Sequence, residues 1–199
     1  MVKDKHKKEV LRKLMHISSI ILPLIYRFVF LNNRKLTFLF LVPLAFLFLT
    51  IEIIRLHNKT FQKIFINIFG VLLRKHEINN FTGATYLITS SIVCIAVFPA
   101  DIAFLSISFL AIGDTLASVV GLTFGKRRFL GSKKSLEGSI ACFAGTLLFA
   151  IFFINPWVAL AGAFTATLAE FSHIPLNDNI QIPVISGIVM SIVSIFIIF

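Results

Sequence analysis

The sequence predicts an all-α polytopic membrane protein with about seven transmembrane helices, and three observations support this fold class. Of the 199 residues, 57% are hydrophobic and only 14% are charged, whereas soluble domains contain about 45–50% apolar and about 25% charged residues. The mean hydropathy is +0.93. Apolar stretches of 16 to 23 residues recur along the chain, close to the length of about 20 residues that a helix needs to cross a hydrocarbon core of about 30 Å.

Seven segments have the length and the apolar character of a transmembrane helix. They cover residues 15–31, 36–54, 81–99, 102–124, 137–154, 157–172 and 182–199. Asn155 and Pro156 form a turn signal between the fifth and sixth segments, because the uncharged stretch there is too long for one ordinary span. Residues 60–73 are shorter and amphipathic, which favours a helix lying in the membrane interface. Without internal repeats or a Pro/Gly/Ser-rich linker, the chain is predicted to form one domain over residues 1–199.

The distribution of Lys and Arg predicts the orientation of these helices. Sixteen of the 19 lysines and arginines fall in the N-terminal tail or in the loops after the second and fourth segments; the others are Arg27, Arg34 and Lys35. Because Lys and Arg concentrate in cytoplasmic loops, the N-terminus is predicted to be cytoplasmic. The net charge of +10 fits anionic lipid neighbours better than nucleic acid, so no nucleic-acid partner is expected.

Asp114 lies inside the fourth apolar segment. An ionisable residue there costs about 2.5–3.5 kcal/mol on insertion and marks a functional site by default. Gly113, Ala117, Gly121 and Gly125 recur every fourth residue and form a smooth stripe that lets a helix or a ligand come close. Two interpretations stay open. The stripe is a packing seam with a hydrogen-bonded aspartate, or Asp114 lines a polar cavity as a metal ligand or general base.

A basic loop with the sequence GKRRFLGSKKSLEG follows this segment. Glycines let a backbone approach a ligand, and lysines supply point charges suited to phosphate. Ser135 is a candidate N-cap of the next helix, whose free N–H groups would face an anion. As an alternative, the loop only contacts anionic lipid. That interpretation explains the basic residues, but it explains neither the glycines nor the signal for a helix start. The candidate phosphate-binding residues, which the family resemblance described below implies to be nucleotide-binding, are Gly121, Gly125, Lys126, Lys133, Lys134, Ser135, Glu137 and Gly138.

Two further polar clusters fall on the same predicted side of the membrane. At the start of the first segment, one helical face carries Glu9, Arg12 or Lys13, and His16. An entry helix whose charged side chains only extend to the membrane surface would show the same pattern. Near the C-terminus, the stretch AEFSHIPLNDNIQIP offers carboxylate and amide oxygens that suit Mg²⁺, although a solvated turn has the same composition. Its candidate ligands are Glu170, Asp178 and Asn179.

Two acids in the middle of the chain have structural interpretations. Glu52 and Arg55, three residues apart, are predicted to form an internal ion pair at a helix end. For Glu77, helix capping is at least as good an interpretation as contact with a ligand.

The stretch GDTLASVVGLTFGK, followed by KKSLEGS, resembles the central motif of the CTP-dependent lipid kinases, which include dolichol kinase, phytol kinase and the CTP-type diacylglycerol kinase. The elements EVLRKLMH, IEIIR, HEINNFTGATY and LAEFSHIPLNDNIQIP match others of this family in order, so the resemblance spans residues 9–183. The central motif is also similar to that of phosphatidate cytidylyltransferases. Their late signature contains Lys and Arg, and here neither residue follows Lys134, which makes that family the second choice.

The resemblance implies that the γ-phosphoryl group of CTP, the co-substrate, is transferred to the hydroxyl of a membrane lipid alcohol, with Mg²⁺ or another divalent cation as cofactor. Such chemistry needs positioning, charge neutralisation and a base. The resemblance implies catalytic roles for Asp114, Arg12, Lys13 and His16, and metal ligands among Asp114, Asp178, Glu170 and Asn179. The expected location is the cell membrane of a prokaryote or the endoplasmic reticulum of a eukaryote. A small transporter is a further alternative, but the sequence shows no paired repeats or broken helices.

Overall fold

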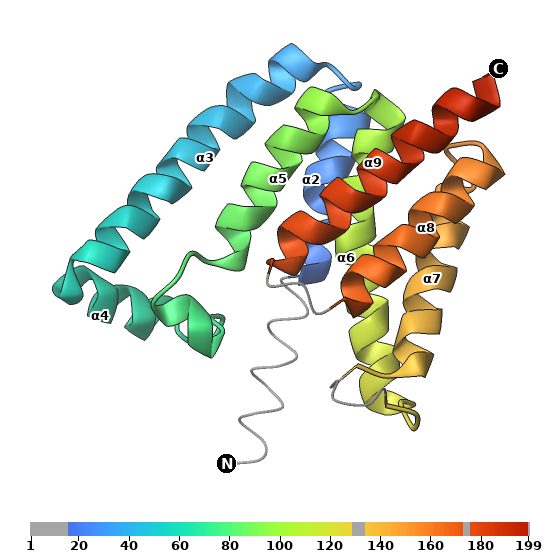
Figure 1. The fold of residues 1–199 in the computed structure, drawn as a ribbon. Coiled ribbons are helices and arrows are strands. Elements are labelled where there is room, and N and C mark those ends of the chain that lie inside the picture. Colours follow the sequence, from blue (N-terminus) through green and yellow to red (C-terminus); the bar gives the residue numbers. More distant parts are fainter. Residues whose placement is uncertain (1–15, 129–133, 173–175, 199) are drawn as a thin grey trace.

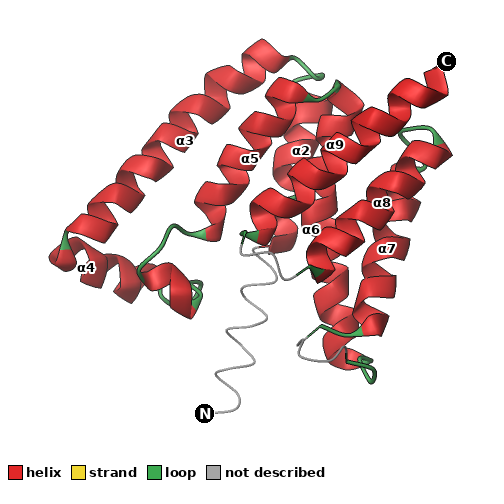
Figure 2. Cartoon of the chain, viewed as in Figure 1, coloured by secondary structure: helices red, strands yellow, loops and turns green. Residues whose placement is uncertain are grey.

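The computed structural model describes residues 16–128, 134–172 and 176–198. In these residues the secondary structure is helical, and the only β-type pairing is an isolated bridge between Arg128 and Ser135 (Figure 2). The helices are α2 (Ile21–Leu24), the π-helix η1 (Ile25–Val29), α3 (Arg34–His57), α4 (Lys59–Phe69), the 3-10 turn η2 (Lys75–Ile78), α5 (Gly83–Val97), α6 (Ala100–Thr123), α7 (Leu136–Ala150), α8 (Pro156–Phe171) and α9 (Asp178–Ile198).

The all-helical prediction is confirmed, and each of the seven predicted segments overlaps a helical element. Three helices, α3, α6 and α9, are long and apolar enough to cross a membrane by length and composition. Shorter apolar helices cover His16–Val29, Gly83–Val97 and Leu136–Ala150. The number of seven spans and their orientation remain predictions.

Capping side chains explain where several helices begin. The Asn58 side chain accepts hydrogen bonds from the backbone N–H groups of Thr60 and Phe61. Asn58 is therefore the N-cap of the amphipathic helix α4, which follows the end of α3. Asn155 caps α8 in the same way, and Pro156 occupies its first turn. The predicted division of the long uncharged stretch into two helices is therefore confirmed, with an Asn–Pro start for the second one.

Helix α6 lies at the centre of the bundle, where it packs against α2, α5, α7, α8 and α9 (Figure 1). Its first half, from Ile102 to Ala111, is buried throughout and forms the hydrophobic core with parts of the surrounding helices. At this end of the bundle Arg27 and Asp101 form an ion pair, and Arg34 donates a hydrogen bond to the carbonyl oxygen of Phe98 at 2.6 Å.

The opposite end of the bundle gathers the polar segments. Figure 1 shows that α3, α6 and α8 finish there and that α5, α7 and α9 begin there, with α4 beside the end of α3. The second half of α6, which carries Asp114, points toward this end. This arrangement agrees with the predicted topology, in which the acids and the basic loop share one side, and it positions the candidate site.

Candidate functional site

A polar cavity of about 310 Å³ opens between α6, α7 and the adjoining ends of α8 and α9. Asp114, Gly121 and Ser118 contribute from α6, one helical turn or more apart on one face. The other lining residues are Ala117, Leu122, Arg128, Lys134, Ser135, Gly138, Ser139, Glu170 and Asp178. The structure thus brings together predicted residues from the central motif, from the basic loop and from the acidic stretch near the C-terminus.

Cations and carboxylates face each other across this cavity. The Lys134 ammonium lies 3.2 Å from Oε1 of Glu170, and the Glu170 side chain is only 8% exposed. Its second oxygen, Oε2, is buried and has no hydrogen-bond partner among the described residues. A buried carboxylate oxygen without a donor is unfavourable by itself. Such an oxygen is suited to a cation or a donor group brought in by a ligand.

The glycine stripe of α6 allows α7 to pack very close to it. A methyl group at Gly121 would lie 2.9 Å from Oγ of Ser135, and one at Gly138 would lie 2.6 Å from the carbonyl oxygen of Ala117. Side chains at these positions would separate the two helices. The sequence left two interpretations of this stripe open, a packing seam and a polar cavity, and the structure contains both. The seam forms the wall of the cavity that contains Asp114.

The described part of the basic loop is fastened to the start of α7. Oγ of Ser135 accepts a hydrogen bond from the N–H of Gly138 at 3.1 Å, so the predicted N-cap is confirmed. The Glu137 carboxylate accepts from the N–H of Arg127 at 3.2 and 3.3 Å. Lys126 is exposed and does not line the cavity. Gly125 packs against Ser135. Of the remaining predicted site residues, Arg12, Lys13 and Lys133 lie outside the described residues.

A second cavity, of about 420 Å³, lies between α3, α4, α5 and the start of α9. Most of its wall is apolar, and a smaller set of polar side chains also lines it. The apolar lining residues include Phe48, Ile51, Phe65, Phe69, Leu72, Leu73 and Leu87, and the polar ones include His16, Ser19, Glu52, Arg74, Glu77 and Asn179.

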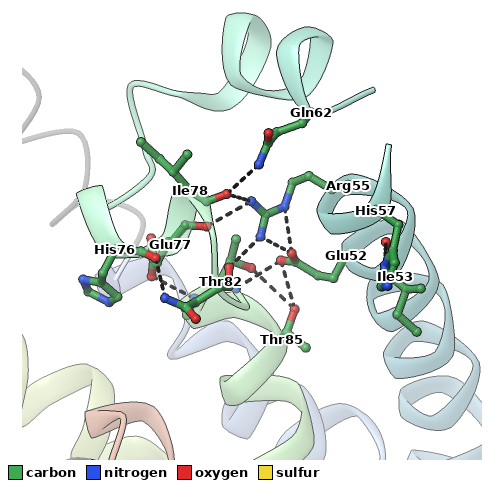
Figure 3. Close-up of polar contacts among 12 residues, drawn as sticks. Glu52, Ile53, Arg55, His57, Gln62, His76, Glu77, Ile78, Thr82 and Thr85 are labelled. Carbon is green, nitrogen blue, oxygen red and sulfur yellow. Dashed lines mark hydrogen bonds and ion pairs between the residues drawn. The ribbon is translucent and has the colours of Figure 1, made fainter. Parts of the chain in front are cut away.

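A buried polar network includes Glu52, Glu77 and Thr82 of the second cavity, and Figure 3 shows its contacts. Arg55 is completely buried, and its guanidinium pairs with the Glu52 carboxylate, with Nε–Oε2 at 2.8 Å. The same guanidinium donates to the carbonyl oxygens of Glu77, Ile78 and Asn80. The predicted ion pair between Glu52 and Arg55 is confirmed. It also anchors the loop between α4 and α5 to the end of α3.

Glu77 is engaged in the same loop. Its Oε2 accepts from the N–H of Arg74 at 2.7 Å, and its Oε1 accepts from the N–H of Gly83 at 3.0 Å. The capping interpretation of Glu77 is therefore confirmed. Glu52 likewise accepts from the N–H of Thr82 at 3.1 Å through its second oxygen. Because these carboxylates bind backbone donors, they serve as fixed walls of the second cavity.

His16 and Asp114 join the two cavities. Nδ1 of His16 lies 3.5 Å from Oδ2 of Asp114, and the two side chains are 18% and 20% exposed. His16 lines the apolar cavity, whereas Asp114 lines the polar one. The start of α9 is shared in the same way, with Asp178 on the polar cavity and Asn179 on the apolar one.

The predicted metal ligands are therefore divided between the cavities. Asp114, Glu170 and Asp178 line the polar cavity, while the Asn179 amide donates to the carbonyl oxygen of Gly83 at 2.7 Å on the other side. In the described part of the chain, no three His, Cys, Asp or Glu side chains gather closely enough to hold a metal ion by themselves.

Two features were not predicted from the sequence. Arg128 lines the polar cavity because its backbone pairs with Ser135, whereas the sequence offered no reason to single it out among the loop cations. The apolar cavity was missed altogether. Its apolar lining residues come from α3, α4, α5 and the turn after α4, and their positions are equally compatible with contact to lipid, so no local pattern distinguishes them.

Three proteins similar to this chain are diacylglycerol kinases. The CTP-dependent diacylglycerol kinase 1 of Eremothecium gossypii is 31% identical over 92% of this chain and 67% of that protein. Those of Schizosaccharomyces pombe and Saccharomyces cerevisiae are 27% and 26% identical, over 71% and 94% of this chain, respectively, and over 74% of each relative. No protein-family model and no solved structure matches the chain. With identity and coverage of this extent, and with residues of the matched motifs lining two adjoining cavities, the chain belongs to the CTP-dependent lipid kinase family that includes these diacylglycerol kinases.

Proposed function

We propose that this protein transfers the γ-phosphoryl group of CTP to the free hydroxyl of diacylglycerol, which yields phosphatidate and CDP. The observation that carries this proposal is the His16–Asp114 pair, which connects a polar cavity to an apolar one. The names of the relatives supply CTP as the donor and diacylglycerol as the acceptor. The hydroxyl oxygen forms a bond to the γ-phosphorus while the bond to the bridging oxygen of CDP breaks.

The polar cavity provides the groups that a triphosphate requires. Lys134 and Arg128 contribute positive charge, and the N-terminus of α7 adds the partial positive charge of a helix start. Ser135 and Gly138 keep that helix end close to α6, so phosphate oxygens can approach the backbone. We propose that the phosphates of CTP lie here. In this proposal Lys133 belongs to the same phosphate site, as predicted from the sequence.

His16 is the proposed base. A phosphoryl transfer needs little covalent assistance, but the acceptor hydroxyl must lose its proton to a group within reach. The His16 imidazole faces the apolar cavity, and Asp114 lies behind it at 3.5 Å. Asp114 thus orients the ring and stabilises the imidazolium that forms when the proton arrives. Arg12 and Lys13 precede His16 in the same motif, and their catalytic roles stay predictions from the sequence.

A divalent cation is compatible with the carboxylates of the polar cavity. Proteins usually bind Mg²⁺ through one or two carboxylates together with substrate phosphates, rather than in a complete protein cage. Asp114, Asp178 and Glu170 line the cavity, and the Oε2 atom of Glu170 has no hydrogen-bond partner among the described residues. We propose these three residues as the ligands. When bound with the nucleotide, Mg²⁺ neutralises phosphate charge. Asn179, which lines the other cavity, is not included in this proposal.

We further propose that both cavities open toward the cytoplasm and that α4 lies in the membrane interface. The bias of Lys and Arg supports this orientation. Most residues that line the two cavities also come from helix ends and loops at one end of the bundle, and Figure 1 shows that the predicted cytoplasmic loops meet at that end. In this arrangement CTP arrives from water, and the lipid arrives from within the bilayer.

The test is an assay of label transfer with the purified protein in detergent micelles. CTP labelled at the γ-phosphate is supplied with Mg²⁺ and with diacylglycerol, a polyprenol, dolichol or phytol. We expect label to appear in phosphatidate, with unlabelled CDP as the second product. In a parallel reaction that contains phosphatidate as the acceptor, CTP labelled at the α-phosphate gives a labelled CDP-lipid and pyrophosphate only if the protein is a cytidylyltransferase. Label in none of the lipids contradicts the kinase assignment, and label only in an isoprenoid alcohol contradicts diacylglycerol as the acceptor.

A further inference from the structure

We propose that the apolar cavity between α3, α4 and α5 binds the acyl-chain region of the acceptor lipid and delivers its hydroxyl to His16. This inference rests on the proposed function, since it names the place of the lipid in that reaction. Phe48 and Ile51 of α3, Phe65 and Phe69 of α4, and Leu87 of α5 form the wall. Burying hydrocarbon against such side chains contributes about 0.8 kcal/mol per methylene group.

The position of the cavity matches the polarity of a glycerolipid. The apolar wall is continuous with a polar part that contains His16, Ser19 and Asn179. A diacylglycerol has the same sequence of properties, with hydrocarbon chains, then ester groups, then one hydroxyl. With the chains between α3 and α5, the hydroxyl end reaches His16. The phosphates lie on the other side of the His16–Asp114 pair.

The charges of the cavity favour a neutral lipid over a phosphorylated one. Among the lining residues, Arg74 is the cation, and Glu52 and Glu77 are the acids. Both acids already accept hydrogen bonds from Arg55 or from backbone N–H groups. A lipid with a dianionic phosphate would meet these carboxylates with a single cation in reach, which is unfavourable. The occupant is therefore a lipid alcohol, such as diacylglycerol, rather than phosphatidate.

Helix α4 has the character of a cover for this cavity. Phe65 and Phe69 line the cavity, with Phe69 remaining 44% exposed, and Lys59, Lys63 and Asn67, spaced by one turn, are exposed as well. An amphipathic helix with this pattern lies along the headgroup region and keeps its apolar face toward hydrocarbon. The buried network around Arg55 holds the loop after α4 against α3 (Figure 3). Helix α4 thus forms one wall of the cavity on the side of the predicted interface.

The experiment uses a diacylglycerol that carries a photoreactive diazirine in one acyl chain, with the purified full chain in detergent. After irradiation, the modified residues are identified by peptide mass spectrometry. We expect labelling on the cavity-facing residues of α3, α4 and α5, and loss of that labelling with excess dioleoylglycerol. Labelling restricted to other surfaces, such as the outer faces of α7 and α9, overturns the proposal. This measurement does not depend on turnover.

A matched pair of variants gives the second readout. Ile51→Trp fills part of the cavity, whereas Ile53→Trp makes the same change at a side chain that is 51% exposed outside it. Displacing about two methylene groups predicts an increase of about tenfold in the KM for dioleoylglycerol, with the KM for CTP unchanged. Photolabelling of Ile51→Trp should fall by a similar factor. Equal behaviour of the two variants contradicts the proposal.

The two proposals fail in different ways. If the wild type does not transfer phosphate but the cavity is labelled, the kinase assignment fails and the lipid site stands. If the wild type is active but label falls elsewhere, only the lipid site fails. If Ile51→Trp does not fold, the labelling pattern of the wild type still decides the question.

Discussion

Replacement of Asp114 by asparagine tests the central pair of the site. The change keeps the size and shape of the side chain but removes the charge that faces His16 at 3.5 Å. At an effective dielectric constant of about 20, two unit charges at this distance interact by about 4.7 kcal/mol. Because the side chains are 18% and 20% exposed, solvent screening lowers the expected effect to about 3 kcal/mol. This predicts a decrease in kcat of about a hundredfold.

The assay is the initial rate of γ-phosphate transfer at saturating CTP and diacylglycerol. Asp101→Asn is the matched control, because it makes the same change at the other end of α6, where Asp101 pairs with Arg27. We expect the control to retain the wild-type rate within about threefold, and both variants to insert into membranes normally. An Asp114→Asn enzyme that keeps more than a third of the wild-type kcat would refute the role given to this carboxylate.

A double-mutant cycle separates the pair from the metal site. If Asp114 acts through His16, then His16→Ala and Asp114→Asn each reduce kcat strongly, and the double variant is little worse than either single one. If Asp114 acts only through a bound cation, the two losses multiply. In that case the Asp114 variant should also need a higher Mg²⁺ concentration for half-maximal activity, while the His16 variant should not.

The remaining predictions concern the walls of the two cavities. Lys134→Met should raise the KM for CTP about tenfold without changing the KM for the lipid. Lys126→Met, at an exposed position outside the cavity, should change the KM for CTP less than threefold. Equal effects of the two changes on the KM for CTP would contradict the phosphate site. Gly138→Ala places a methyl group 2.6 Å from the Ala117 carbonyl oxygen, so thermal unfolding should show a destabilisation of about 1–3 kcal/mol, and an unchanged Tm would show that α6 and α7 can move apart. Arg55→Met leaves a buried carboxylate without its cation and should destabilise the protein by about 3–5 kcal/mol, a prediction that a Tm within 2 °C of wild type, as an approximate limit, would contradict.

Much of the fold follows from local sequence. Apolar segments, Asn caps and the Asn155–Pro156 start determine where the helices lie, because each signal acts within one or two turns. The Glu52–Arg55 pair was predictable for the same reason, since residues three apart on a helix are neighbours. The contacts of Arg55 with the backbone of the later loop were not predictable. Carbonyl groups have no residue-specific signature, and the loop has to be folded before it can present them.

The polar cavity was partly predictable, and the apolar cavity was not. Charged residues in an apolar chain are rare, so topology alone brings Asp114, Lys134, Glu170 and Asp178 to one end of the bundle. Apolar side chains give no comparable signal, because in a membrane protein they face lipid, protein or a cavity with the same composition. Which of them line a cavity depends on the angle between α3 and α5 and on where α4 turns back. The capping by Asn58 starts that turn, but it does not fix its direction.

The two cavities also explain how one small bundle can join a water-soluble donor to a lipid acceptor. In phosphoryl transfer, water competes with the lipid hydroxyl for the same phosphorus, and exclusion of water decides which one reacts. His16 and Asp114 are both mostly buried, and they meet where the polar and apolar cavities adjoin. In the proposed mechanism, a hydroxyl that arrives from the apolar side displaces water from His16, whereas an empty apolar wall offers water few partners for hydrogen bonds. The proposed geometry would therefore favour a lipid acceptor and protect CTP against hydrolysis.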